Sequence, residues 1–214
     1  MDAALRQLND ELDTVTQRLI DEARLMTGSD LRAPSLLPGW SRAQVLAHLA
    51  RDADAMRNLL VGARAGQDRL AYASPEARDA DIDNSAAAEA KELVDDVASS
   101  AMALRTVALQ LPDKAWRYQL RIPDSPRFPA SQLLTRRLAE VELHHCDLGI
   151  GYSHHQWSAV FATMELGAPL RSQRAERLGY IQPESVRARS MARKVPPYQP
   201  GRPLPGSWIG RGQA

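Results

Sequence analysis

Apolar residues near the start of the chain recur at intervals of three and four, which is the spacing of one face of an amphipathic helix. The positions that share this spacing are Leu5, Leu8, Leu12, Val15, Leu19, Ala23 and Met26. The pattern predicts one long helix, ended by Gly28 and Ser29.

A second helix is predicted from its start signal. The turn LPGW leads to Ser41, and Gln44 follows three residues later, as in the capping box that satisfies the first backbone N–H groups of a helix. The apolar stripe continues through Val45, Leu49, Met56 and Leu60. We expect this helix to run through about Ala63.

Two further helices are predicted before a long connection. In the segment SPEAR, Ser74 is a candidate N-cap and Pro75 takes the first helical position, which suits proline. An alanine-rich stretch with helical periodicity predicts a third long helix from about Ser85 to Leu111. Residues 112–130 contain four prolines and are expected to form an extended connection.

A fourth long helix is predicted from Ser131, as its N-cap, to about Leu148, before Gly149 and Gly151. Its apolar stripe consists of Leu134, Leu138, Val141 and Leu148. No segment shows a convincing strand pattern. Four long helices predict an all-α fold, a four-helix bundle over residues 1–152.

The end of the chain differs in composition from the bundle. Residues 171–214 carry nine basic and two acidic side chains, with six prolines and five glycines. Such a segment buries too little apolar surface to offset its chain entropy. We expect residues 153–178 to form one extra helix, and residues 179–214 to be an extended or disordered tail.

The amino-acid composition indicates the class of protein. The chain has 214 residues, 44% of them hydrophobic and 25% charged, as in soluble globular proteins. It has no apolar run of the roughly 20 residues that cross a membrane, and no signal peptide core. Its one cysteine, Cys146, fits the cytoplasm. The 24 arginines among 27 basic residues indicate a GC-rich genome more than a nucleic-acid surface.

The fourth helix carries candidate chemistry. Glu140 and His144 are four residues apart, so their side chains rise from one helix face and can clamp a divalent metal. His48, on the second helix, is the candidate third ligand. Two histidines and one carboxylate leave a coordination position open, as a catalytic zinc requires.

A plainer interpretation stays open from spacing alone. Arg137, Glu140, His144 and Asp147 form a polar stripe beside the apolar one, and that stripe is also what a solvated helix face looks like. His48 is then a satisfied histidine in the core or at its boundary. The spacing E-x-x-x-H is common by chance, so without further information the plainer interpretation is favoured.

Three segments change that balance. SLLPGWSRAQVLAHLARDADAMRNLL, YASPEARDADI and PASQLLTRRLAEVELHHCDLGIGY together resemble the mycothiol-dependent maleylpyruvate isomerase family, which has a DinB-like four-helix fold. The resemblance covers about residues 5–152. It implies that His48, Glu140 and His144 bind zinc, although the DinB-like fold also accepts nickel and iron.

The resemblance also implies a reaction. Coordination ionises the thiol of mycothiol, and the thiolate is the nucleophile. Its addition to the double bond of maleylpyruvate permits rotation, and elimination leaves the trans isomer. The implied partners are this small-molecule thiol and a small anionic or electrophilic substrate. We expect a monomer or homodimer, without membrane or nucleic-acid partners.

Three more residues are candidates at the site. Arg78 and Arg137 are placed to bind the cofactor or a carboxylate of an anionic substrate, or else both lie on helix surfaces. Asp147 either orients His144 or only assists the helix end. Cys146 lies about 200° around the helix from His144, so we expect a buried apolar role for it.

The chain departs from the family after the bundle. Full isomerases carry a second α/β domain there, and it is not recognisable in the last 60 or so residues. Two alternatives to the isomerase therefore stay open. One is a mycothiol S-transferase or conjugating enzyme, and the other is a non-catalytic bundle that binds a thiol or a partner.

Overall fold

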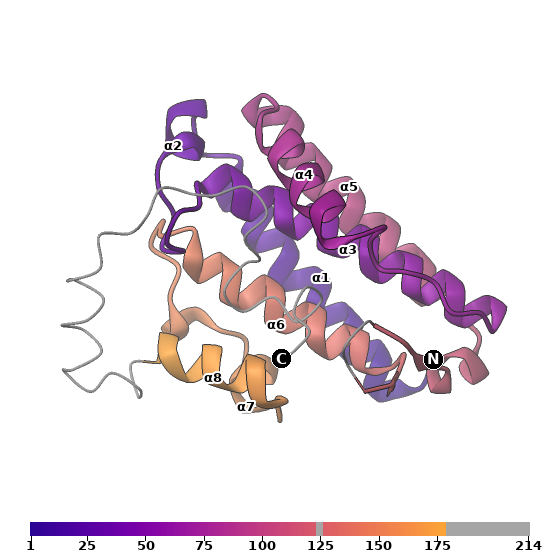
Figure 1. The fold of residues 1–214 in the computed structure, drawn as a ribbon. Helices are drawn as coiled ribbons and strands as arrows, with labels where there is room; N and C mark the ends of the chain where they lie inside the picture. Colours follow the sequence, from indigo (N-terminus) through magenta and orange to yellow (C-terminus); the bar gives the residue numbers. More distant parts are fainter. Residues whose placement is uncertain (123–125, 179–214) are drawn as a thin grey trace.

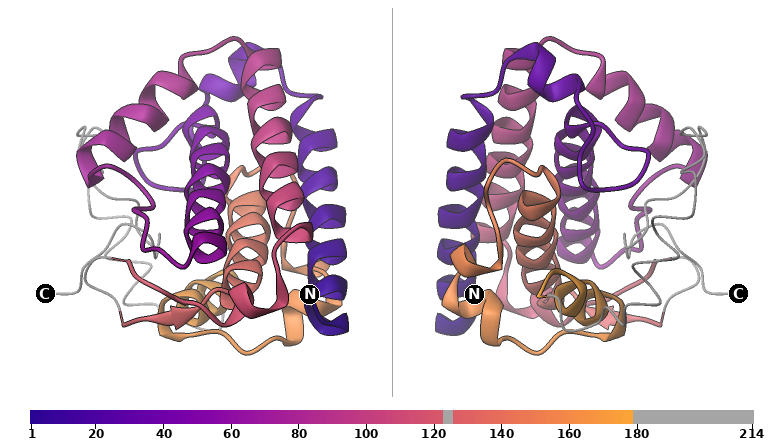
Figure 2. Two further views of the ribbon diagram at one scale, coloured as in Figure 1. Left: turned by 90° about the vertical axis from the view of Figure 1, so that its right-hand side faces the viewer. Right: turned by 90° about the vertical axis from the view of Figure 1, so that its left-hand side faces the viewer.

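Four long helices form the framework of the protein (Figure 1). They are α1 (Ala3–Ala23), α3 (Arg42–Ala65), α5 (Ala90–Leu109) and α6 (Gln132–Asp147). The structure, a computed structural model, describes residues 1–122 and 126–178. Helices α1 and α3 each contact both α5 and α6, so the four helices close a ring, and Figure 2 shows them side by side. The predicted all-α four-helix bundle is confirmed.

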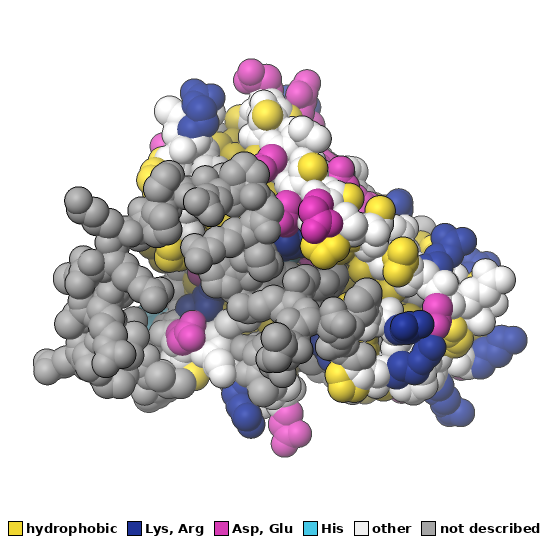
Figure 3. Space-filling model, viewed as in Figure 1, with side chains coloured by type: hydrophobic (Ala, Val, Ile, Leu, Met, Phe, Trp, Pro, Cys, Tyr) yellow, Lys and Arg dark blue, Asp and Glu magenta, His cyan; other side chains and the backbone are white. Residues whose placement is uncertain are grey.

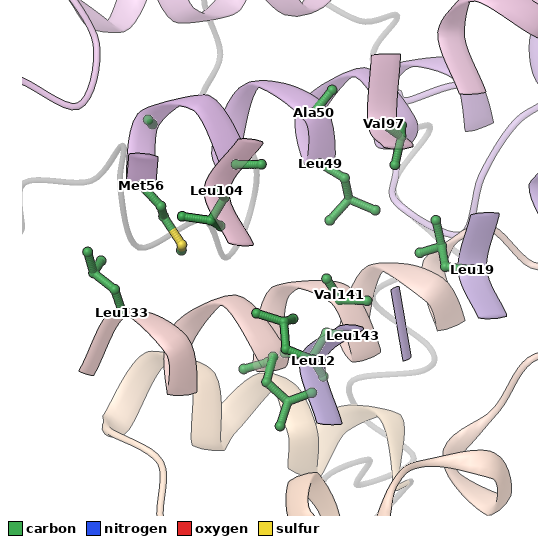
Figure 4. Close-up of a cluster of buried hydrophobic side chains, with 14 of the residues drawn as sticks. Leu12, Leu19, Leu49, Ala50, Met56, Val97, Leu104, Leu133, Val141 and Leu143 are labelled. Atoms are coloured by element: carbon green, nitrogen blue, oxygen red, sulfur yellow. The ribbon is translucent and has the colours of Figure 1, made fainter. Parts of the chain in front are cut away.

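Apolar side chains from all four helices fill the centre of this ring (Figure 4). Leu19 of α1, Leu49 of α3, Leu104 of α5 and Val141 of α6 are each at most 3% exposed. Burying one such side chain stabilises the folded state by about 1.5–3 kcal/mol. The helical periodicity of the sequence therefore identified the faces that form the core.

Two of the predicted helix starts are confirmed, and the predicted end of the first helix is not. Ser41 and Gln44 form the predicted capping box of α3, and Ser74 caps α4 (Pro75–Ala86). Gly28, however, does not end the first helix, which stops at Ala23. It begins the short helix α2 (Gly28–Arg32), because Thr27 and Asp30 form a capping box of their own.

The third long helix begins later than predicted, and the fourth begins where predicted but without a side-chain cap. Ser85 belongs to α4, and α5 starts only at Ala90, because the backbone at Glu89 is extended and separates the two helices. Ser131 stands at the start of α6, but its backbone is already helical and its side chain makes no capping hydrogen bond. Ser131 thus occupies the predicted N-cap position, but its side chain does not cap the helix.

The connection before α6 is more ordered than a plain loop. A 3-10 helix, η1 (Asp113–Arg117), leads to a short antiparallel pair of strands, β1 (Gln119–Leu120) and β2 (Phe128–Pro129). Leu120 pairs with Phe128, and both side chains are buried. The strands are two residues long, which is too short for an alternating sequence pattern to reveal.

The segment after α6 forms three short helices instead of one. They are η2 (His154–Gln156), α7 (Ala159–Thr163) and α8 (Ala168–Arg177). Helices α7 and α8 pack against α6, and the extended backbone at Met164 and Gly167 separates them. The predicted tail, residues 179–214, lies outside the described residues.

Charge is unevenly spread over the face shown in Figure 3. Acidic side chains are prominent over α4 in the upper part of the view, and Lys and Arg side chains gather at the lower right, near the N-terminus. Within the described ranges, none of the helices combines the length and apolar character needed to cross a bilayer.

Candidate metal centre

His48, Glu140 and His144 converge at the contact between α3 and α6. The Oε2 atom of Glu140 lies 3.2 Å from Nε2 of His48 and 3.1 Å from Nε2 of His144. One ligand atom from each residue lies within 4.8 Å of the other two, and all three side chains are buried. The helical spacing predicted one face for Glu140 and His144, and the fold brings His48 opposite them.

The burial of α6 overturns the solvated-face interpretation. Every residue from Arg137 to Leu148 is buried, on all sides of the helix. The inner side faces α1 and α3, and α7 and α8 cover the outer side. His48 is likewise fully buried and in contact with Glu140, so of the two plain alternatives it is a core histidine and not a boundary one.

Asp147 fixes the orientation of the His144 ring. Its Oδ2 atom lies 2.9 Å from Nδ1 of His144, so Nδ1–H donates to the carboxylate and Nε2 faces Glu140. A carboxylate bonded to the far nitrogen is the usual way to set the tautomer of a metal-binding histidine. This is the contact expected if Asp147 orients His144.

Two buried polar atoms of the cluster lack hydrogen-bond partners within the described part of the chain. They are Nδ1 of His48 and Oε1 of Glu140. Buried polar atoms are rarely left unpaired, because desolvation without a replacement bond is costly. A cation bound by the cluster would satisfy Glu140, and the donor set of two nitrogens and one carboxylate suits a divalent transition metal.

The three residues of the cluster differ in the direction in which their pKa values are shifted. Burial lowers the pKa of His48 to about 3, so its imidazole is neutral at neutral pH. Burial also disfavours the charged form of His144, but hydrogen bonds to Asp147 and Glu140 prevail and raise its pKa to about 9. The pKa of Glu140 is lowered despite burial, because both histidines donate to it. Metal binding therefore has to displace a proton from His144.

Arg177 of α8 is a further residue beside this site. Its guanidinium contacts both carboxylate oxygens of Asp147, with Nη2 2.6 Å from Oδ2 and 2.8 Å from Oδ1. Burial raises the pKa of Asp147, but the bonds from His144 and Arg177 outweigh it and keep that pKa low. The sequence gave no indication of this contact, because 30 residues separate the two positions.

The two candidate arginines are buried, so the helix-surface alternative was wrong for both. Arg137 forms an ion pair with Asp52 of α3, 2.7 Å apart. Arg78 of α4 pairs with Asp79 at 2.7 Å, but its Nε and Nη2 groups have no partner among the described residues. Arg78 lies near enough to His48 to help lower the pKa of that histidine.

Tyr72 is a site residue that the sequence analysis missed. Its ring lies 5.9 Å from the Arg78 guanidinium, and its buried hydroxyl has no hydrogen-bond partner within the described ranges. Burial raises the pKa of Tyr72, so the hydroxyl is protonated and able to donate. Tyr72 and Arg78 thus lie beside each other, and both carry buried donors that have no hydrogen-bond partner among the described residues.

Cys146 takes no part in the cluster. It is a free, buried thiol whose pKa is raised by burial to about 11. Within the described ranges, His48, Glu140 and His144 form the one group of three or more residues with metal-binding geometry. The expectation that Cys146 is a buried apolar residue agrees with this placement.

Comparison with known proteins identifies the family. The model of the mycothiol maleylpyruvate isomerase N-terminal domain matches residues 12–149. The chain belongs to this family. The predicted family is therefore confirmed, and so is the helical fold that the resemblance implied. No curated protein sequence matches the chain.

Two solved structures of the mycothiol-dependent maleylpyruvate isomerase are similar to this family member. One is a histidine-to-alanine variant, with 26% sequence identity, and the identity to the other is 27%. Each comparison has a TM-score of 0.70 and covers 73% of this chain but 65% of the isomerase chain. The chain thus spans less than two thirds of the solved isomerases.

Proposed function

We propose that the protein is a metal- and mycothiol-dependent enzyme that isomerises maleylpyruvate or a closely similar cis-unsaturated acid. The observation that carries this proposal is the convergence of His48, Glu140 and His144 within one buried cluster. Membership of the isomerase N-terminal domain family supports the same reaction class. The metal-binding unit that we propose is residues 1–152.

The three ligands suit zinc, with a position left for a thiol. When bound, a divalent metal supplies Lewis acidity that ionises a coordinated thiol at neutral pH. The chain contributes the orientation of its ligands: Asp147 holds Nδ1–H of His144, which leaves Nε2 for the metal. His48 is neutral at neutral pH and needs no deprotonation to bind.

Arg78 and Tyr72 are the groups that we propose for the substrate. A small dicarboxylate carries more negative charge than a buried site accepts without matching donors. The unpaired Nε and Nη2 groups of Arg78 form a planar fork that fits a carboxylate, and the Tyr72 hydroxyl adds a third donor. Arg137 is engaged by Asp52, so we assign cofactor or substrate contact to it only through its unpaired Nη2 group.

One observation favours a second candidate function. The segment after α6 folds back on that helix as α7 and α8, and Arg177 of α8 contacts Asp147 beside the cluster. A site that is bordered by different segments of chain accepts a different electrophile. The second candidate is therefore transfer of mycothiol to an electrophilic substrate, with the same thiol activation.

An isomerisation assay tests the proposal. With zinc and mycothiol, the protein should convert maleylpyruvate to its trans isomer, followed by ultraviolet absorbance, and omission of mycothiol should abolish conversion. Arg78→Met should lower kcat/KM by about 10- to 100-fold, the cost of one lost charged hydrogen bond. Arg64→Met, on the exposed end of α3, is the matched control and should leave kcat/KM unchanged.

The outcomes separate the candidates. Conversion that needs both zinc and mycothiol supports the isomerase. No conversion, together with conjugate formation from mycothiol and an alkylating electrophile, replaces it by S-transfer. A protein that binds zinc and mycothiol but consumes neither substrate is the non-catalytic bundle.

A further inference from the structure

The ion pair between Arg177 and Asp147 joins α8 to the candidate metal centre. Beside its two Nη2 contacts, Arg177 places Nε 3.1 Å from Oδ1 of Asp147. Asp147 is 4% exposed, so the carboxylate is almost wholly removed from water. Fork-like pairs of this kind fix the direction of a carboxylate as well as neutralising it.

Asp147 needs such a partner because of its place in the helix. It is the last residue of α6, where the helix dipole disfavours a negative charge. A buried carboxylate at this position, bonded to His144 alone, would carry an uncompensated charge. Arg177 supplies the compensation: its Nε and Nη2 groups both donate to Oδ1, and Nη2 also donates to Oδ2, the oxygen that accepts from His144.

The docking of α8 does not depend on Arg177. Arg174, one turn earlier, donates from Nη1 to the backbone oxygens of Phe161 and Met164, at 2.7 and 2.9 Å. Leu170 is buried against the core. These contacts hold the helix in place, and Arg177 is free to serve the carboxylate.

We propose that Arg177 is a positioning residue of the metal centre, acting through Asp147 on His144. It holds the carboxylate where Nδ1–H of His144 donates to it, and this keeps Nε2 directed at the metal. The residue lies beyond positions 12–149, which the family model matches, so α8 completes the centre from outside that region. The inference rests on the proposed metal site.

Two physical effects of removing Arg177 have opposite signs, which makes the proposal testable. If Arg177 acts only as a nearby positive charge, it repels a dication, and its removal strengthens metal binding. If it positions Asp147, its removal weakens metal binding, as happens when outer partners of metal ligands are lost. We expect the second effect to prevail, because the carboxylate is buried and needs a partner.

Zinc affinity of the full chain, measured by competition with a chromophoric chelator, decides between them. Arg177→Met should bind zinc about tenfold more weakly, and Asp147→Asn about 10- to 100-fold more weakly. The double variant should bind no more weakly than Asp147→Asn alone, since both changes remove the same interaction. Arg171→Met, at an exposed position of α8, is the matched control and should retain the zinc affinity of the wild type.

Two further measurements separate positioning from loss of folding. Arg177→Lys keeps the charge but not the fork, so its zinc affinity should lie between those of the wild type and Arg177→Met. In the zinc-loaded protein, the Nδ1–H proton of His144, followed by NMR, should exchange with water faster in Arg177→Met.

The inference is overturned if Arg177→Met binds zinc as tightly as the wild type or more tightly, or if its effect adds to that of Asp147→Asn. That result leaves the metal site itself intact. A wild-type protein that binds no zinc overturns the proposed function as well, so the two failures are distinguishable.

Discussion

Helices α3 and α6 make two buried polar contacts, one helical turn apart, and these differ in kind. Asp52 and Arg137 form an ion pair whose charges cancel. One turn away, Glu140 meets the rings of His48 and His144, and the carboxylate charge is balanced only when a histidine is protonated or a cation binds. Burial alone therefore does not mark a functional site. The ion pair is neutral without an added proton or cation, and the His–Glu–His cluster is not.

The largest expected effect on the free energy of unfolding comes from breaking the ion pair between Asp52 and Arg137. Asp52→Ala leaves the Arg137 guanidinium buried without its counter-charge, which should lower the free energy of unfolding by about 3–5 kcal/mol. Burial raises the pKa of Asp52 to about 6 against the opposing effect of Arg137, so urea unfolding is measured at pH 7.5, where the pair is ionised.

The matched control replaces both partners. A double variant with Asp52→Leu and Arg137→Met should lose far less stability than Asp52→Ala, because no unpaired charge remains. It should also retain zinc binding, since neither residue is a ligand. Equal losses in the single and double variants would show that packing, and not charge, dominates this contact.

A smaller effect concerns the pH dependence of the metal-free protein. The pKa of His144 rises from 6.5 to about 9 on folding, so the folded state holds its proton more tightly than the unfolded state. This contribution to stability is fully present below pH 6.5 and is lost as the pH rises through 9.

Urea unfolding of chelator-treated protein checks this window. The free energy of unfolding should fall between pH 6.5 and pH 9 in the wild type, and much less in His144→Gln. The same fall in both proteins would show that another group titrates. Zinc should remove the pH dependence at the upper end of the window, because the metal replaces the proton.

The helices were predictable because they are local. Periodic apolar residues and capping signals such as Ser41 with Gln44 depend on neighbours a few positions away, and the structure confirms them. The starts of α2 and α5 were missed because short polar turns decide them, at Thr27 and Glu89. Neither turn interrupts the apolar periodicity strongly enough for the helix boundary to be predicted from that periodicity.

The surroundings of α6 were not predictable from its own sequence. Its polar stripe has the pattern of a solvated face, but in the fold this stripe meets Asp52 and His48 of α3, and α7 and α8 also pack against the helix. The same limit applies to Arg177, whose contact with Asp147 joins positions 30 residues apart. The family resemblance pointed to the three residues that the structure brings together, whereas spacing alone favoured a solvated face, which the burial of α6 contradicts.

Titration of the cobalt-substituted protein with mycothiol tests the central claim most directly. If the His48, Glu140 and His144 cluster binds a metal with a position open for a thiol, mycothiol should add a cobalt–thiolate charge-transfer band in the near ultraviolet. The band should saturate at about one thiol per metal, and glutathione should produce it less well. His48→Ala should lack it while retaining the helical circular dichroism of the wild type. A wild-type protein that holds cobalt but shows no band and no heat of binding with mycothiol would contradict the account.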